Sequence, residues 1–344
     1  MIYFVGIYPD VIGHHVRGWG RPLPDCLRVM SYAELTRSRT LPAGTYVFCD
    51  IDGLSRSDAE KSARVAAHLA GEGFRVLNHP LRSLKRYELL RRLREEGLNR
   101  FEVYHATEAR WPVRYPVFVR EAARYTPHLG PLLANRAELE AELAARVTAG
   151  LSRDDTLIVE FCDTADAGGV YRKYSAFVVG GRIIPAHIVF SKDWVAKGLD
   201  LRDEHLLAEE RRFIETNPHV AQLQQVFALA AIEFGRIDYA MLDGAMQVWE
   251  INTNPWLIPW VPKDLARQPA AEASARLLNA ALIAIDTVAS GVPTRNPLRR
   301  AWVRARWRAV IGSFLSVLGL GRHEPRVAEA LARWDVQLRR RLGR

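Results

Sequence analysis

The stretch GRIDYAMLDGAMQVWEINTNP, residues 235–255, combines a turn signal with acidic side chains on both of its flanks. Apolar residues alternate on either side of Asp243-Gly244, a dipeptide that is common in tight turns, so the stretch predicts a β-hairpin. Four polar residues on the two predicted strands bear on function. They are Arg236 and Asp238 on the first strand, and Glu250 and Asn252 on the second.

The length of the loop decides which of these side chains face each other. If residues 243–245 form a three-residue loop, Asp238 lies directly opposite Glu250, and Arg236 lies opposite Asn252. A two-residue loop would instead move Glu250 to the other face, because a shift of one residue turns every side chain over.

Two carboxylates placed directly opposite each other destabilise a sheet, and a divalent cation between them would reverse that effect. Together with the amide of Asn252, Asp238 and Glu250 offer only oxygen ligands, which suit Mg²⁺ or Mn²⁺ better than zinc. An exposed charged hairpin that ends in an ordinary Asn-Pro turn is the alternative. The residues alone leave both interpretations open.

The spacing Glu250-x-Asn252-x-x-Pro255, with Asp238 twelve residues upstream (250 − 238), resembles the metal-binding end of the ATP-grasp superfamily. D-alanine–D-alanine ligases, glutathione synthetases and ribosomal-protein glutamate ligases share this pattern. The resemblance implies ATP and Mg²⁺ (or Mn²⁺) as cofactors, with Asp238, Glu250 and Asn252 as metal ligands. It also implies that Arg236 is a catalytic residue, which stabilises the transferring phosphoryl group or the tetrahedral intermediate.

The same resemblance implies a set of nucleotide contacts upstream of the hairpin. They are Lys85, Arg120, Glu160, Phe161, Cys162, Asp163, Arg172 and Lys173. Lys85, in the helix SLKRYELLRRLREEGL, would bind an ATP phosphate. Arg120, in YPVFVREA, stands where the superfamily usually has lysine, and its guanidinium can bind phosphate through two N–H groups.

The segment LIVEFCD resembles the strand and hinge against which adenine packs in the superfamily. Glu160 would lie near the exocyclic amine of the base, and backbone groups of Phe161 and Cys162 would read its edge. Asp163 or Asp166 would contact the ribose. A basic residue of the next strand, Arg172 or Lys173, would touch the phosphates or the acyl substrate.

Alternating strand and helix patterns in residues 1–80 predict a small parallel α/β unit, with His14-His15 in the loop after the first strand. The expected fold class is therefore α/β, with α+β subdomains. From the resemblance we expect an ATP-grasp domain over 81–290, with a nucleotide-binding part at about 81–165 and a metal-binding part at about 166–290. A basic helical extension over 291–344 follows.

The net charge of +9 resides in that extension, where 291–344 carries thirteen arginines, no lysine and three acids. The rest of the chain is nearly neutral, so specific nucleic-acid binding is not expected of the whole protein. The extension is interpreted as a helical segment packed on the body or on a second subunit, as a peripheral membrane anchor, or as a site for an acidic partner.

The three cysteines, Cys26, Cys49 and Cys162, match neither a metal site nor a disulfide framework, which indicates a reducing cytoplasm. No signal peptide and no transmembrane helix are expected.

The resemblance implies ATP-dependent ligation of an acid to an amine through an acyl phosphate, on a small molecule, an amino acid or a peptide. Two alternatives remain: a small-molecule kinase that uses the same metal-binding face, and a nucleotide-binding partner protein without activity. The identity of the substrates does not follow from the sequence.

Overall fold

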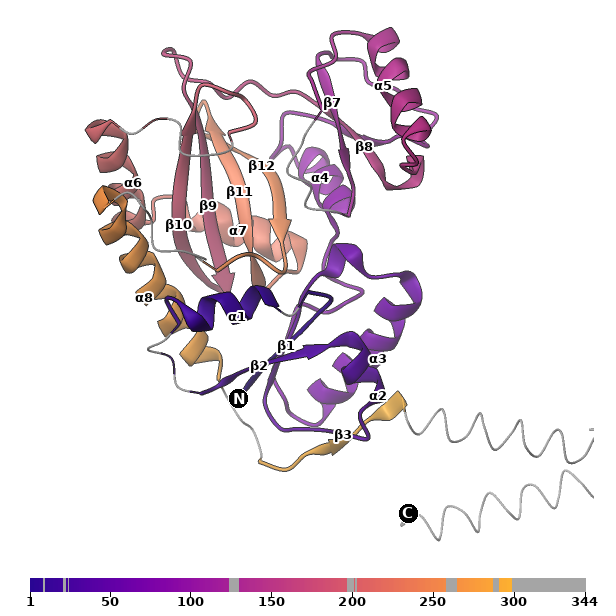
Figure 1. Ribbon diagram of the computed structural model, residues 1–344, viewed down its shortest axis with the longest axis vertical. Coiled ribbons are helices and arrows are strands. Elements are labelled where there is room, and N and C mark those ends of the chain that lie inside the picture. The colour runs from indigo at the N-terminus through magenta and orange to yellow at the C-terminus, as the bar shows by residue number, and fades with distance from the viewer. Residues whose placement is uncertain are drawn as a thin grey trace, which may run out of the picture. The chain divides into compact units, whose positions relative to one another are not determined.

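The computed structural model describes residues 1–8, 10–20, 23, 25–123, 130–196, 201, 203–257, 265–286 and 291–298. The chain divides into two compact units, Met1–Arg295 and Asn296–Arg344, and the account below concerns the first. Within its described part, helices combine with one parallel sheet and with antiparallel sheets, which confirms the predicted α/β class (Figure 1). Nearly all of the predicted basic extension, from residue 299 onward, lies outside the described residues.

The N-terminal part is built on a parallel sheet with the strand order β2-β1-β4-β5. Its strands are β1 (Ile2–Gly6), β2 (Leu27–Ser31), β4 (Thr45–Phe48) and β5 (Val76–Leu77). Its helices are α1 (Asp10–Arg17), α2 (Tyr32–Arg37), the 3₁₀ turn η1 (Ile51–Gly53) and α3 (Arg56–Gly71). The predicted parallel unit is present, but the expected loop position of His14 and His15 is wrong, since both residues lie on α1.

A three-stranded antiparallel sheet with the order β6-β8-β7 follows. Its strands are β6 (Val103–His105), β7 (Val117–Glu121) and β8 (Thr156–Glu160). The helices around it are α4 (Arg86–Glu95), α5 (Arg136–Thr148) and η2 (Arg153–Asp155). Asn135 begins α5 by accepting a hydrogen bond from the Glu138 N–H, an ordinary N-cap.

The largest sheet is antiparallel, with the order β10-β9-β11-β12. Its strands are β9 (Tyr171–Val179), β10 (Arg182–Ser191), β11 (Phe234–Leu242) and β12 (Ala245–Asn252). The helices after β10 are α6 (Glu204–Thr216), α7 (Val220–Ala230), η3 (Leu265–Arg267) and α8 (Gln268–Ile285). Figure 1 shows α6 and α8 beside β10, at the opposite edge of the sheet from β12. A short pair, β3 (Thr40–Leu41) with β13 (Thr294–Arg295), returns the chain to the N-terminal part.

Helix α4 joins the small sheet to the large one through an apolar stripe. Leu89, Leu90 and Leu93 recur at helical spacing, are 0–1% exposed, and pack in one core cluster with Phe101 and with residues of β11, β12 and α7. Each fully buried leucine stabilises the fold by about 1.5–3 kcal/mol. Replacement of Leu93 by alanine would cost about 2–5 kcal/mol, since a cavity would remain. The stripe therefore holds α4 against the large sheet.

The hairpin β11–β12 reaches the predicted pairing by an unexpected route. Its turn has two residues, because Leu242 pairs with Ala245, and Asp243 and Gly244 have φ angles of 50° and 74°. Positive φ at both positions is the requirement of a type I′ turn. Of the two loop lengths considered, the structure therefore has the two-residue one.

Continued along the strands, the register of that turn would place Trp249 opposite Asp238. A β-bulge intervenes, because Tyr239 pairs with Val248 while Asp238 pairs with Glu250, which leaves Trp249 as an extra residue. The bulge restores Glu250 to the face of Asp238, so the predicted pairing is right although its predicted cause is not.

Among the helices that the structure describes, none is both long enough and apolar enough to cross a membrane. The three cysteines are free, and Cys26 and Cys49 are buried.

Candidate functional site

A row of polar side chains crosses the large sheet from strand to strand. His187 on β10 pairs with Ser175 on β9, Ser175 pairs with Asp238 on β11, and Asp238 pairs with Glu250 on β12. Arg236 and Asn252 form the next pair on the same face, since side chains two residues apart point the same way. The sheet thus collects the predicted metal ligands and the predicted catalytic arginine in adjacent positions.

Asp238 is buried, at 8% exposed, and its charge has two neighbours. Ser175 Oγ donates a hydrogen bond of 2.7 Å to Asp238 Oδ1, and Arg236 Nε lies 3.3 Å from the same oxygen. Asn252 is also 8% exposed, and its Oδ1 accepts a hydrogen bond from the Asn254 N–H at 2.8 Å. An amide oxygen has a second lone pair, so this bond leaves Asn252 able to act as a ligand.

Glu250 is held by two arginines through a single oxygen. Arg86 Nη2 lies 2.9 Å and Arg120 Nη2 lies 2.5 Å from Glu250 Oε2. Burial by itself would raise the pKa of the Glu250 carboxyl, but the positive charges of Arg120 and Arg86 outweigh it and hold this pKa well below its usual range. Glu250 is therefore ionised, as a metal ligand must be.

A cavity of about 280 Å³ is lined by Asp238 and Glu250 of these pairs, but not by Arg236 or Asn252. Its apolar lining consists of Leu90, Phe101, Phe118, Val159, Phe161, Cys162, Trp194, Val195, Ala196 and Trp249. Its polar lining consists of Arg120, Thr164, Tyr171, Arg172, Lys173, Asp238 and Glu250. The lining therefore suits a ligand that combines a flat apolar group with an anionic group.

Aromatic rings form the walls of the apolar part. The rings of Phe101 and Trp249 are stacked with centroids 5.2 Å apart, and those of Phe118 and Trp194 are 5.0 Å apart. Phe161 meets Trp194 edge to face at 5.7 Å. Such walls suit a planar ring system, because aromatic pairs favour offset or edge contacts. Because of the β-bulge, Trp249 and its neighbour Glu250 both line the cavity.

Five of the eight predicted nucleotide contacts line the cavity: Arg120, Phe161, Cys162, Arg172 and Lys173. Arg172 is already engaged, with Nε 2.8 Å from Glu209 and Nη1 2.5 Å from Asp166. Lys173 makes no side-chain hydrogen bond or ion pair with any residue that the structure describes, so its charge faces the cavity uncompensated.

Glu160 is placed differently from the prediction. It is 2% exposed and is absent from the cavity lining, while its strand neighbours Val159 and Phe161 line the cavity. Its carboxylate accepts hydrogen bonds from the Glu102 N–H at 3.0 Å, from Tyr104 Oη at 3.2 Å, and from Arg114. Because side chains alternate along a strand, Glu160 points to the side away from the cavity.

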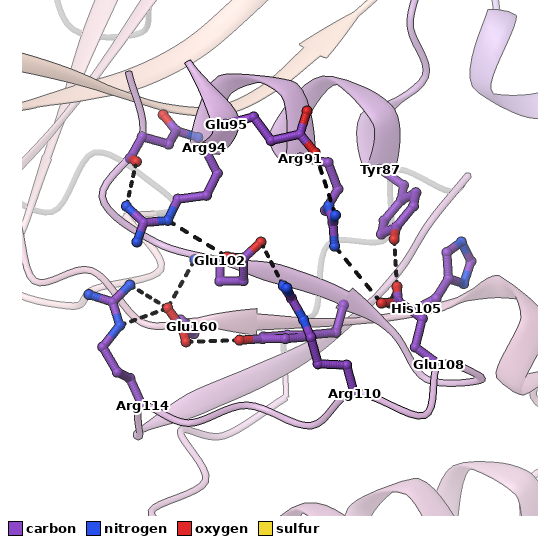
Figure 2. A network of polar contacts seen from close by, with 12 residues as sticks. Tyr87, Arg91, Arg94, Glu95, Glu102, His105, Glu108, Arg110, Arg114 and Glu160 are labelled. Atoms are coloured by element: carbon purple, nitrogen blue, oxygen red, sulfur yellow. Dashed lines mark hydrogen bonds and ion pairs between the residues drawn. The ribbon is translucent and has the colours of Figure 1, made fainter. Parts of the chain in front are cut away.

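Figure 2 shows the polar network that holds Glu160 and extends to α4. Glu102 lies 3.1 Å from Arg110 and 3.7 Å from Arg94. Burial, together with the charge of Glu160, raises the pKa of Tyr104 to about 12, so its hydroxyl remains a donor. The network joins side chains around β6 and β8, and none of these side chains lines the cavity.

Tyr87 Oη donates to Glu108 at 2.5 Å and ties the first turn of α4 to the segment after β6 (Figure 2). Lys85, the predicted phosphate ligand, precedes this helix and is directed elsewhere. Its Nζ donates to the Leu54 carbonyl at 2.9 Å, and it is absent from the cavity lining. Arg86, one residue later, reaches Glu250 instead.

Asp163 is also absent from the cavity lining, and its Oδ1 accepts a hydrogen bond from the Ala165 N–H at 3.1 Å. Among the residues of the site that the sequence did not indicate are Arg86, Phe101, Trp194 and Trp249. The one local signal for any of them is the position of Arg86 beside Lys85 at the start of an amphipathic helix.

No family model and no curated protein matches this chain. Solved structures of ligases do match. D-alanine–D-alanine ligase from Bacillus anthracis complexed with ATP is 12% identical, with 82% of this chain and 97% of that chain covered and a TM-score of 0.45. ATP-grasp ligase PsnB complexed with a minimal precursor is 16% identical, with 82% and 98% covered and a TM-score of 0.46.

The RimK domain protein ATP-grasp from Sphaerobacter thermophilus is 14% identical, with 82% and 100% covered and a TM-score of 0.45. The chain is thus similar to these three proteins over most of its length, at low sequence identity.

Proposed function

We propose that this protein is an ATP-dependent, Mg²⁺- or Mn²⁺-dependent carboxylate–amine ligase of the ATP-grasp type. One observation carries the proposal: Asp238 and Glu250 face each other across β11 and β12, and both line a cavity that aromatic and basic side chains also line. A nucleotide combines the matching features, a flat base and a charged phosphate chain.

The polar residues of the lining and their neighbour Arg236 fit an anionic ligand that carries a divalent cation. Arg120 Nε and Arg236 Nε are buried donors without a hydrogen-bond partner among the described residues. A buried unsatisfied donor costs about 1–3 kcal/mol, a cost that phosphate oxygens would remove. In the described chain no group of three His, Cys, Asp or Glu side chains could hold a metal, so the protein would supply few ligands. Mg²⁺ is commonly bound by one or two carboxylates together with substrate phosphates.

We assign the metal-binding role to Asp238, Glu250 and Asn252, and the binding of phosphate to Arg120 and Lys173. Arg120 is paired with Glu250 in this structure, so phosphate binding would require Arg120 to exchange one anionic partner for another. Phe161 and Cys162 would lie beside the base, and Arg172 at the phosphate end. Residues 81–165 and 166–290 are the proposed nucleotide-binding and metal-binding parts.

The chemistry follows from charge. A carboxylate is a poor electrophile until its oxygen accepts the γ-phosphoryl group of ATP, which yields ADP and an acyl phosphate. The amine then attacks the acyl carbon, phosphate leaves, and the amine gives up a proton. Negative charge grows on the phosphoryl oxygens and then on the acyl oxygen. Arg236, next to Asp238, would stabilise both.

The proposal is tested with ATP, Mg²⁺ and a panel of amino acids and dipeptides, with hydroxylamine added to trap acyl phosphates as hydroxamates. ADP, phosphate and a new amide or hydroxamate support the ligase. ADP with a phosphorylated hydroxyl or guanidine compound would show a kinase instead. Nucleotide binding without turnover would favour the binding protein, and AMP with pyrophosphate would contradict both enzymes.

We further propose that the protein acts in the cytoplasm on a small molecule, an amino acid or a peptide. Residues 291–344 would contact an anionic membrane or an acidic partner, or would support a homo-oligomer. These proposals depend on the sequence composition and on the free cysteines.

A further inference from the structure

Arg86 has a position that the proposed reaction does not yet use. It opens α4, and its side chain is 1% exposed although it carries a full charge. Its backbone N–H donates to Asp52 Oδ1 at 2.8 Å. Its guanidinium donates to the carbonyls of Glu121 and Ala122 at 3.0 and 2.7 Å, and to Glu250 at 2.9 Å. One residue thus joins η1, the end of β7 and the metal-binding strand β12.

The two arginines on Glu250 leave one of its oxygens open. Arg86 and Arg120 both bind Oε2, and none of the described residues donates a hydrogen bond to Oε1. Glu250 lines the cavity, and its side chain is 20% exposed. A carboxylate held by one oxygen presents the other in a fixed direction. Partners that orient a metal ligand in this way are common behind metal sites.

The two arginines differ in how firmly they are held. Arg86 has backbone acceptors at two further residues in addition to Glu250, and it is almost fully buried. Arg120 lines the cavity, and its side chain is 13% exposed and contacts no described residue through a hydrogen bond or ion pair other than Glu250. An incoming phosphate can therefore attract Arg120 at the loss of one side-chain contact, whereas displacement of Arg86 would break at least three.

We propose that Arg86 is a positioning residue for the metal site: it holds Glu250 Oε2 so that Oε1 faces the cation, and it stays in place when Arg120 turns to the phosphates. The inference rests on the proposed role of Glu250 as a metal ligand. Arg86 touches neither nucleotide nor metal in this scheme and acts through Glu250 alone.

The test compares Arg86→Lys with Arg92→Lys, a matched control on the exposed face of the same helix. Lysine keeps the positive charge but cannot reproduce the planar fork of donors. Mn²⁺ binding to the protein saturated with the non-hydrolysable analogue AMPPNP is measured by electron paramagnetic resonance. AMPPNP binding itself is measured without metal by calorimetry.

We expect Arg86→Lys to weaken Mn²⁺ binding by about 10- to 100-fold, the usual cost of losing a partner that orients a metal ligand. AMPPNP affinity without metal should change less than about 3-fold, because the phosphate contacts are elsewhere. Arg92→Lys should change neither quantity. Equal losses of Mn²⁺ and of metal-free AMPPNP affinity would indicate a merely structural role and would overturn the proposal.

A double-mutant cycle checks that Arg86 acts through Glu250. In a Glu250→Gln background, Arg86→Lys should cause no further loss of Mn²⁺ affinity, since the oriented carboxylate is already gone. An additive loss would contradict the proposal. If Arg86→Lys does not fold, as judged by circular dichroism, Arg86→Gln keeps amide N–H donors for the carbonyls and takes its place with the same expectations.

The failure of this inference can be told apart from the failure of the proposed function. If the wild-type protein binds Mn²⁺ with AMPPNP and Arg86→Lys matches it, only the role of Arg86 is wrong. If the wild-type protein saturated with AMPPNP binds no Mn²⁺, the proposed function fails, and the role of Arg86 fails with it.

Discussion

Asp238 and Glu250 are register partners on adjacent strands, although the two-residue turn that joins those strands would by itself place them on opposite faces. The extra residue Trp249 in β12 corrects the register between the turn and the site. Trp249 is in turn stacked on Phe101 of the small-sheet region, so the bulge has a partner far away in sequence. Two carboxylates held face to face need positive charge beside them, which Arg86 and Arg120 supply to Glu250 and Arg236 supplies to Asp238.

Asp238→Asn and Glu250→Gln are each expected to abolish ATP turnover while the fold remains intact. Loss of one ligand from an electrostatic clamp commonly costs about 10²-fold or more in rate. ADP release is measured over a range of Mg²⁺ concentrations, and circular dichroism checks the fold. Asp243→Asn, at the exposed turn of the same hairpin, is the control, because Asn-Gly forms the same turn. Near-native turnover in either variant would contradict the assignment of Asp238 and Glu250 as metal ligands.

Arg236→Ala is expected to reduce kcat much more than it reduces ATP affinity. The reason is that negative charge builds up in the transition state, next to the buried Nε of Arg236. Removal of one such donor commonly costs about 10²- to 10³-fold in kcat. Turnover and nucleotide titration are measured on the same preparation. A loss of ATP affinity at constant kcat would contradict the catalytic role.

Glu160→Gln is expected to lower stability and to leave the nucleotide site nearly unchanged. The carboxylate faces Arg114 and Tyr104 rather than the cavity, and loss of its charge weakens several buried hydrogen bonds at about 1–3 kcal/mol in total. Urea denaturation measures the stability, and the KM for ATP should stay within about 3-fold of the wild-type value. A large and selective rise in the KM for ATP would restore the base-reading role that the sequence suggested.

His187 gives the fold a pH dependence on the acidic side. Burial, together with the positive charge of Arg236, lowers the pKa of His187 to about 3. Between pH ~6.5 and about 3 the unfolded chain binds a proton at this site that the folded chain does not, so stability falls as the pH falls. One such group contributes at most about 1.4 kcal/mol per pH unit.

The variant His187→Gln should therefore show a shallower loss of melting temperature over that range than the wild-type protein. Its melting temperature at neutral pH should change little by comparison. Identical slopes in the two proteins would mean that His187 does not carry this proton linkage.

Removal of residues 291–344 is expected to leave ATP turnover on a soluble substrate largely intact if the basic extension is a targeting device. Full-length protein should then sediment with anionic liposomes at low salt and be released at high salt, since surface charge is screened. Neutral liposomes are the control. If the full-length protein does not bind anionic liposomes and the truncated protein is insoluble, the extension has a structural role.

The sequence by itself determined the parallel N-terminal unit, the hairpin, and the presence of Asp238 and Glu250 on its two strands. These features depend on local signals: strand alternation, a turn dipeptide, and the spacing of polar residues. The tertiary structure decided the register, the orientation of Glu160 and the reach of Arg86. Each of these depends on contacts between residues far apart in the chain, such as Trp249 on Phe101, Arg114 on Glu160 and Arg86 on Glu250. The spacing of residues along one strand cannot predict a bulge, or an ion pair whose partner lies on another element. Both depend on packing and charge compensation between elements, which arise only in the folded chain.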